Sequence, residues 1–120
     1  MIFLAVEWAS AKRARDHVGQ IAAGWPVDLD DVRVVASELA TNAIRHAKTE
    51  VIGVRAYSVG GVYTVEVWDA DAANLPVLNE QTAVGDGGRG IAVIAELAAH
   101  VGVWCGPEGG KVVYAEWTAS

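Results

Sequence analysis

Three polar residues at four-residue intervals, Glu38, Asn42 and His46, interrupt an otherwise largely apolar stretch of the chain. If this stretch is a helix, their side chains project from nearly one face, because four residues make about one turn. Asn42 offers a neutral oxygen to Mg²⁺, which takes only one or two protein ligands at a nucleotide. Glu38 is placed to accept a proton from a nucleophile that attacks a γ-phosphate. A solvated polar stripe on an amphipathic helix explains the same spacing equally well.

A second candidate, Asp69, directly follows the apolar run at 62–68. A carboxylate at the end of a strand accepts a hydrogen bond from an exocyclic amine such as that of adenine. It refuses a purine that carries a carbonyl at that position, because two acceptors would then face each other. An isolated aspartate in this place is also typical of an ordinary turn or helix cap.

A third candidate is the glycine-rich string at 85–90, which matches the G-x-G-x-x-G pattern literally. It does not predict a dinucleotide site, because a polar stretch at 79–82 stands where a buried strand is required. No Lys-Ser/Thr pair follows it, so it is not a P-loop. A glycine-rich turn that opens a helix still presents free N–H groups to phosphate, to which Arg89 adds positive charge. A flexible turn is an equally good interpretation.

Composition limits the classes of function. The 120 residues are 52% hydrophobic and 20% charged, which indicates one soluble globular domain. A formal net charge of −6 argues against general nucleic-acid binding. The single cysteine excludes an internal disulfide, and the three histidines lack the spacing of zinc ligands. The apolar N-terminus is too short for a membrane span and lacks the basic leader of a signal peptide, so we expect a cytoplasmic protein.

Periodicity and turn signals predict the elements that must position these candidates. The order indicates an α+β fold, a two-layer α/β sandwich with a mostly antiparallel sheet and helices on one face. The loop expected at 70–87 is a candidate for a functional lid, because loops of this length are unusual in compact domains. The predicted elements are a strand at 2–8, a helix at 10–23 with Ser10 as N-cap, a helix from Asp28 or Asp30 to about Lys48, strands at 51–59 and 62–68 joined by Gly60-Gly61, a loop at 70–87, a helix at 91–99, and strands at 101–105 and 111–117.

Taken in order along the chain, the three candidates resemble the N, G1 and G2 boxes of the GHKL (Bergerat-fold) ATPases. The stretches at 37–47, 88–91 and 109–116 are similar to those of the small single-domain anti-sigma-factor serine kinases and their stand-alone relatives. The resemblance covers nearly the whole chain. It identifies residues 1–120 as a single histidine-kinase-like ATPase domain with the Bergerat ATP-binding fold.

The resemblance implies that ATP lies between the long helix and the loop at 70–87, which would be the ATP lid. It makes Asn42 the ligand of Mg²⁺ and Glu38 the general base that activates a serine hydroxyl on a protein substrate. By the same implication Asp69 binds the adenine amino group, and the phosphate side is lined by Gly88, Arg89 and Gly90. His46 is assigned a structural role at the helix end.

Family members of this type phosphorylate an anti-anti-sigma protein and, when free of it, sequester a sigma factor. The implied function is therefore regulation of transcription by partner switching, through a serine/threonine kinase without nucleic-acid or membrane partners. Some members form homodimers, which leaves a homodimer open for this chain. Two alternatives stay open: a catalytically weak or inactive Bergerat-fold module that sequesters a protein partner, and an ATPase that transfers phosphate to water.

One position departs from the family pattern. The G1 box commonly reads Asp-x-Gly, whereas this chain has Asp69-Ala70-Asp71. A second carboxylate close to a polyphosphate weakens its binding unless the carboxylate points away or faces the magnesium ion. The orientation of Asp71 is therefore a specific question for the structure.

Overall fold

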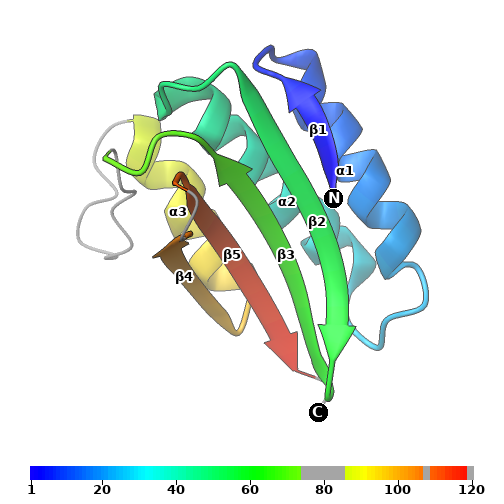
Figure 1. Ribbon diagram of the computed structural model, residues 1–120. Helices are drawn as coiled ribbons and strands as arrows, with labels where there is room; N and C mark the ends of the chain where they lie inside the picture. The colour runs from blue at the N-terminus through cyan, green and yellow to red at the C-terminus, as the bar shows by residue number, and fades with distance from the viewer. Residues whose placement is uncertain (74–85, 107–108, 119–120) are drawn as a thin grey trace.

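The computed structural model describes residues 1–73, 86–106 and 109–118, with the side chains of 86–91 excepted. Within these described residues, five strands and three helices form two layers, and the helices lie on one face of the sheet (Figure 1). The elements are β1 (Ile2–Ala5), α1 (Ala9–Ala22), α2 (Leu29–His46), β2 (Val51–Val59), β3 (Val62–Asp69), α3 (Asp86–Leu97), β4 (His100–Cys105) and β5 (Lys111–Thr118).

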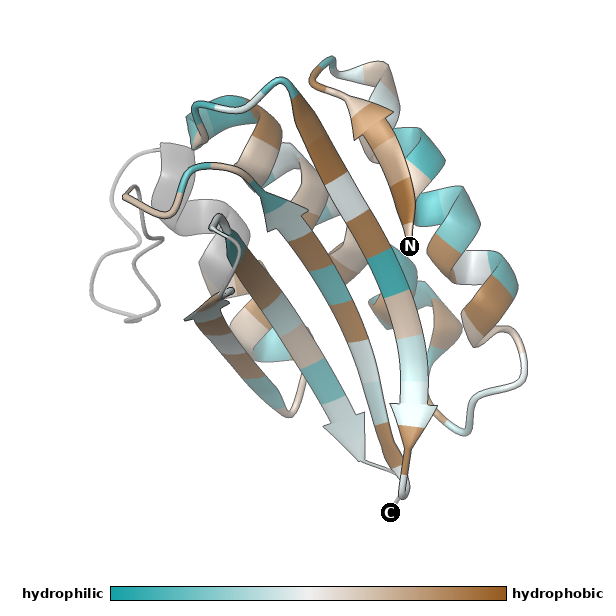
Figure 2. Cartoon of the chain, in the orientation of Figure 1, coloured by the Kyte–Doolittle hydropathy of each residue, from teal (hydrophilic) through white to brown (hydrophobic). Residues whose placement is uncertain are grey.

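The sheet has the order β1-β2-β3-β5-β4, and each neighbouring pair of strands is antiparallel. The predicted α+β sandwich is therefore confirmed. Hydrophobic and hydrophilic residues alternate along β3 and β5, as expected of strands whose two faces meet different surroundings (Figure 2). The strands β1 and β4 lie at the two edges, so β3 and β5 occupy the interior of the sheet.

The turn between β2 and β3 confirms the hairpin that the glycine pair predicts. Gly60 and Gly61 have φ angles of +59° and +81°, a left-handed conformation that residues with a Cβ rarely adopt. Two such residues between antiparallel strands are typical of the turns that match the natural twist of a hairpin. The turn fixes the register in which Val59 pairs with Val62 and Ile52 pairs with Asp69.

The long helix α2 begins at a side-chain cap and forms the centre of the helical layer. The Asp28 carboxylate accepts hydrogen bonds from the backbone N–H groups of Asp30 and Asp31 at 2.9 and 3.2 Å, which satisfies two of the donors a helix start leaves open. Its buried stripe contains five of the six residues predicted to pack, together with Ala40, and Ala47 becomes the half-buried C-cap. The buried residues are Val32, Val35, Ala36, Leu39, Ala40 and Ala43.

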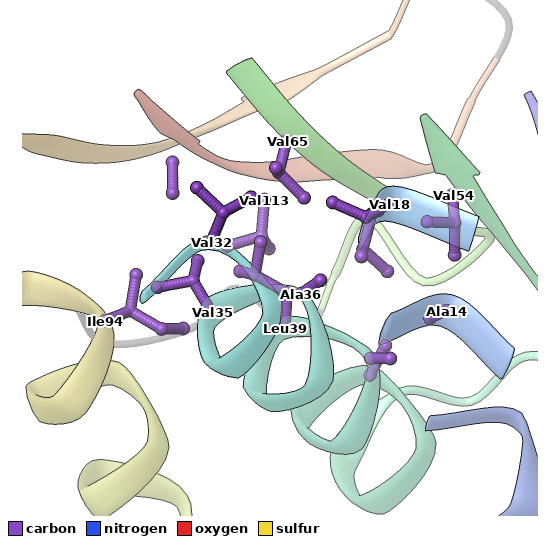
Figure 3. Close-up of a cluster of buried hydrophobic side chains, with 14 of the residues drawn as sticks. Ala14, Val18, Val32, Val35, Ala36, Leu39, Val54, Val65, Ile94 and Val113 are labelled. Atoms are coloured by element: carbon purple, nitrogen blue, oxygen red, sulfur yellow. The ribbon is translucent and has the colours of Figure 1, made fainter. Parts of the chain in front are cut away.

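The core lies between α2 and the sheet, with α1 and α3 on either side (Figure 3). Ala14 and Val18 come from α1, Ile94 comes from α3, and Val54, Val65 and Val113 come from the strands. All of these side chains are at least nine-tenths buried. Complete burial of one such aliphatic side chain contributes about 1.5–3 kcal/mol. The helix that carries the polar candidates is thus held on three sides.

Several predicted boundaries are wrong. Ser10 does not cap α1, because the helix already begins at Ala9 after Trp8, and Ser10 is buried with no hydrogen-bond partner for its Oγ in the described part of the chain. The strand at 2–8 ends at Ala5. The helix expected at 91–99 instead spans Asp86–Leu97, so the glycine-rich string contributes to the helix itself. Residues 74–85 of the predicted lid lie outside the described residues, and none of the helices described is long and apolar enough to cross a membrane.

Candidate functional site

The chemistry-bearing residues gather at one end of the molecule, at the upper left of Figure 1. The end of β3, the start of β5, the last turns of α2 and the start of α3 all lie there. The helix α2 packs against both α3 and β3. Residues far apart in the sequence, such as Asn42 near the end of α2 and Lys111 at the start of β5, therefore belong to one region of the fold.

Glu38 and Asn42 lie one turn apart at the edge of the buried stripe of α2. The adjoining stripe residue Val35 lies beside Ile94 of α3, so these two polar residues occupy the flank of α2 on the α3 side (Figure 3). Both are half-buried. Within residues 1–73, 86–106 and 109–118, neither side chain has a hydrogen-bond or ion-pair partner. A carboxylate and a carboxamide are thus held side by side in a form that a ligand can use.

Asp69 is the last residue of β3, at the end of the strand as predicted, and its carboxylate has partners within the protein. Its side chain is 1% exposed, and Oδ1 accepts hydrogen bonds from the Lys111 ammonium and from the Asp71 backbone N–H, both at 2.8 Å. Lys111 is the first residue of β5 and pairs directly across from Asp69 in the sheet. The Lys111 Nζ also donates to the carbonyl oxygen of Asp71 at 2.7 Å. One oxygen of the carboxylate that was expected to bind the adenine amino group is therefore hydrogen-bonded within the protein.

The orientation of Asp71 answers the question raised by the G1 box. Its Oδ2 accepts a hydrogen bond of 2.8 Å from the backbone N–H of Lys48, just beyond the end of α2. Thr49 makes a second tie, since its hydroxyl accepts from Ala70 N at 3.2 Å and donates to Val51 O at 2.7 Å. Asp71 is used to fasten the segment after β3 to the segment after α2. This hydrogen bond gives the Asp71 carboxylate a structural role.

Gly88, Arg89 and Gly90 are placed in the first turns of α3, whose start lies at this end of the molecule. Their side chains lie outside the described residues, so the predicted phosphate role stays a prediction. His46 is the exposed last residue of α2, and its predicted structural role stays a prediction.

Sequence reasoning missed Lys111 as a site residue, along with Lys48 and Thr49. Lys111 lies in a stretch whose resemblance to the family was clear, but its contact with Asp69 depends on the register of two strands 42 residues apart. A cross-strand pairing of this kind has no local sequence signal. The contacts of Lys48 and Thr49 likewise join segments more than 20 residues apart.

The candidate site offers a ligand for a metal ion that is carried by the phosphates of a nucleotide. Among the described residues no group of three His, Cys, Asp or Glu side chains could hold a metal ion by itself. Mg²⁺ carried by phosphates requires only one or two protein ligands, and the unpartnered carboxamide of Asn42 meets that need. On the base side, Oδ1 of Asp69 already accepts two hydrogen bonds, which leaves Oδ2 as the oxygen that could accept one from a base.

Solved structures with the same fold include two histidine kinases. The histidine kinase domain of a blue-light activated histidine kinase from Erythrobacter litoralis has a TM-score of 0.56 and 20% identity, over 97% of this chain and 62% of that one. The histidine kinase AdeS of Acinetobacter baumannii has a TM-score of 0.52 and 11% identity, over 100% of this chain and 68% of that one. This chain therefore spans less than two thirds of the first of these structures, and at such identities the likeness concerns the fold alone.

No curated protein matches the sequence. The family model described as the histidine kinase-like ATPase domain, in contrast, matches residues 4–117, which include all of the candidate residues and all but the first two residues of β1 and the last residue of β5. The antiparallel sheet covered on one face by helices, with a polar flank on the central helix, agrees with that match. The chain belongs to the histidine kinase-like ATPase family, of the GHKL type.

Proposed function

We propose that this chain binds ATP with Mg²⁺ and acts as a serine/threonine protein kinase that phosphorylates an anti-anti-sigma protein. In this proposal it is an anti-sigma factor that regulates transcription by partner switching and sequesters a sigma factor when unengaged. The observation that carries the proposal is the pair Glu38 and Asn42, held half-buried beside α3 without a partner among the described residues. The resemblance of residues 37–47 to the anti-sigma-factor kinases supports the choice of substrate class.

Each residue has a specific role in this proposal. Asn42 would hold the magnesium ion through its side-chain oxygen, and Glu38 would accept the proton of the serine hydroxyl. When bound, ATP with Mg²⁺ supplies the phosphoryl group and neutralises its charge. The remaining task of the protein is positioning, which the packing of α2 between α1, α3 and the sheet provides. A cytoplasmic location is part of the same proposal, which leaves a homodimer open.

The test is phosphoryl transfer from labelled ATP to a purified anti-anti-sigma protein encoded by the same genome. We expect an acid-stable phosphoserine in the partner, since phosphohistidine is lost in acid. Glu38→Gln keeps the size of the side chain but cannot take up the proton, and a general base contributes about 10²–10⁴-fold. The initial rate should therefore fall by about 100-fold or more, with ATP affinity largely retained.

Glu96→Gln is the matched control, because Glu96 is an exposed residue of α3 with no assigned role. It should transfer phosphate at the rate of the unchanged protein. Equal rates for Glu38→Gln and the unchanged protein would exclude Glu38 as the base. Label on histidine would contradict the serine assignment, and phosphate release without any partner would favour an ATPase.

The engaged state of Asp69 favours a second candidate function, a binding module with weak or no catalysis. In that function the fold is a scaffold that captures a protein partner, and nucleotide turnover is dispensable. Calorimetric titration with ATP and Mg²⁺ separates the two. Heat of binding at sub-millimolar nucleotide supports the kinase, whereas no binding at millimolar nucleotide, together with retained capture of a sigma factor, supports the module.

A further inference from the structure

Asp71, the residue at which the chain departs from the Asp-x-Gly pattern, joins two segments that are far apart in the sequence. Its Oδ2 accepts a hydrogen bond of 2.8 Å from the backbone N–H of Lys48, two residues after the end of α2. Its backbone N–H donates to Oδ1 of Asp69 at 2.8 Å. Asp71 therefore bridges the segment after α2 and the carboxylate at the end of β3.

The backbone of Asp71 is itself held from the start of β5. The Lys111 Nζ donates to the Asp71 carbonyl oxygen at 2.7 Å and to Oδ1 of Asp69 at 2.8 Å. Residue 110 is a glycine with φ of +79°, and a Cβ built there would lie 2.5 Å from the Asp69 carbonyl oxygen. Only glycine allows β5 to begin so close to the end of β3. Contacts of the backbone thus fix Asp71 on the strand side, and its carboxylate is used on the helix side.

The two segments carry the two sides of the proposed nucleotide site, at the same end of the molecule (Figure 1). The C-terminal half of α2 carries Glu38 and Asn42, whose side chains have no partner among the described residues. The end of β3 carries Asp69, whose Oδ2 has no hydrogen-bond partner in the same part of the chain. A nucleotide that contacts both sides binds more tightly when they are already held at the separation it requires.

The side chain, rather than the backbone, is what an aspartate adds at position 71. A glycine there would offer the same N–H and carbonyl groups to Asp69 and Lys111, but no acceptor for the Lys48 N–H. The neighbouring residues support the same junction, because the Thr49 hydroxyl accepts a hydrogen bond of 3.2 Å from Ala70 N. The end of α2 is therefore fastened to the segment after β3 at two adjacent points.

We infer that Asp71 is a positioning residue that sets the separation between the metal side and the base side of the proposed nucleotide site. Its carboxylate fastens the end of α2, so that Asn42 and Asp69 are held ready for the phosphates and the base of one nucleotide. The inference rests on the proposed function, because it concerns how the same site is assembled. It also gives the second carboxylate of Asp69-Ala70-Asp71 a role other than repulsion of phosphate.

The test compares a ligand that contacts both sides with ligands that contact one, by NMR titration in the presence of Mg²⁺. ATP spans both sides, adenosine reaches only the base side, and tripolyphosphate reaches only the metal side. In Asp71→Ala we expect the dissociation constant of ATP to rise about tenfold, while those of the two fragments change by less than about threefold. Asp71→Asn keeps an oxygen that accepts the Lys48 N–H, so its affinity for ATP should stay within about threefold of the unchanged protein.

Two further variants separate the hydrogen bond from the charge of the carboxylate. Lys48→Pro removes the donor and leaves Asp71 in place. Proline suits this position because the preceding Ala47 is extended, with ψ of 141°. This variant should weaken ATP binding as much as Asp71→Ala does. Asp30→Ala removes one negative charge from an exposed residue in the first turn of α2, at the opposite end of the helix, and should leave the affinity for ATP unchanged.

The possible results decide between separate explanations. An affinity for ATP that is unchanged in both Asp71→Ala and Lys48→Pro would overturn the role of Asp71 while nucleotide binding stands. Tighter binding of tripolyphosphate in both Asp71→Ala and Asp71→Asn would also overturn it, because the carboxylate would then act by repelling phosphate. If the unchanged protein binds neither ATP nor a fragment at millimolar concentration, the proposed function itself fails and the inference falls with it. If Asp71→Ala does not fold by circular dichroism, Lys48→Pro decides in its place.

Discussion

Two buried carboxylates on the same strand differ in what surrounds them. Glu66 and Asp69 are three residues apart on β3, so their side chains project from opposite faces of the sheet. Both are almost fully buried, at 3% and 1% exposure, and both are paired with a cation. The cations differ, because the Arg55 side chain beside Glu66 is 44% exposed, whereas the Lys111 side chain beside Asp69 is 5% exposed.

The Glu66 cluster lies on the face of the sheet that carries no helix. Arg55 donates to Oε1 through Nε at 3.0 Å and through Nη2, and the Tyr57 hydroxyl donates to Oε2 at 2.6 Å. The Arg55 guanidinium also lies over the Tyr57 ring at 4.9 Å from its centroid. Glu66 therefore has several donors, and water reaches the cation that balances its charge.

Asp69, in contrast, accepts from the Asp71 backbone N–H and has one buried cation to balance its charge. Without Lys111, the buried Asp69 carboxylate would have neither a cation beside it nor water to solvate it. Without Arg55, Glu66 would keep the hydrogen bond from Tyr57, and water would reach the edge of the cluster. We therefore expect two carboxylates of nearly equal burial to depend differently on their partners. The Lys111–Asp69 pair also lies at the candidate site, whereas the Arg55–Glu66 pair does not.

The largest effect is expected for Lys111→Met, which keeps the length of the side chain and removes its charge. Breaking a buried ion pair by removing one partner lowers the free energy of unfolding by about 3–5 kcal/mol. Urea denaturation followed by circular dichroism measures this loss, and Lys12→Met at an exposed site serves as the control. A loss below about 1 kcal/mol, which is typical of exposed ion pairs, would contradict the expected difference between the Lys111–Asp69 and Arg55–Glu66 pairs.

Local signals predicted most of the elements. The apolar stripe of α2 and its Asp28 cap are both local features, and so is the glycine pair that forms the β2–β3 turn. Each of these depends on residues within one or two turns of each other, where spacing alone determines the conformation. For the same reason the shared flank of Glu38 and Asn42 could be predicted before any tertiary structure was considered.

The failures have tertiary causes. Ser10 has the chemistry of an N-cap, but α1 begins one residue earlier, and Ser10 is packed into the interior. The glycines at the start of α3 have low helix propensity and predict a turn. They instead form the first turns of a helix that packs against α2. The engagement of Asp69 by Lys111 depends on strand register, which fixes contacts between residues far apart in the sequence.

A smaller effect is expected for Arg55→Met. Its charge is partly hydrated already, and Tyr57 continues to donate to Glu66, so the free energy of unfolding should fall by about 1 kcal/mol. The same urea denaturation, run in parallel with Lys111→Met, gives the ratio of the two losses. If Arg55→Met is as destabilising as Lys111→Met, solvent access to the cation does not distinguish the two carboxylates.

The smallest effect, and one with a distinct pH dependence, is expected for Tyr57→Phe. The hydrogen bond to Glu66, followed by burial and by repulsion from that carboxylate, raises the pKa of the Tyr57 hydroxyl above its ordinary value of 10.0. A raised pKa in the folded state means that folding favours the protonated phenol, so this contribution is complete below about pH 10 and is lost as pH rises through the folded pKa. At pH 7 the variant should be less stable by about 0.5 kcal/mol, the lower end of the usual net value of one hydrogen bond.

Unfolding in urea between neutral pH and about pH 11 tests this expectation. The difference in stability between the unchanged protein and Tyr57→Phe should shrink above about pH 10, because only the unchanged protein loses the protonated phenol there. Tyr63→Phe is the matched control at neutral pH, since the Tyr63 hydroxyl makes no hydrogen bond within the described residues, and it should change stability less than Tyr57→Phe. A difference for Tyr57→Phe that stays constant with pH would mean that the phenol and Glu66 are not coupled, and Arg55 would then be the side chain that holds the Glu66 carboxylate.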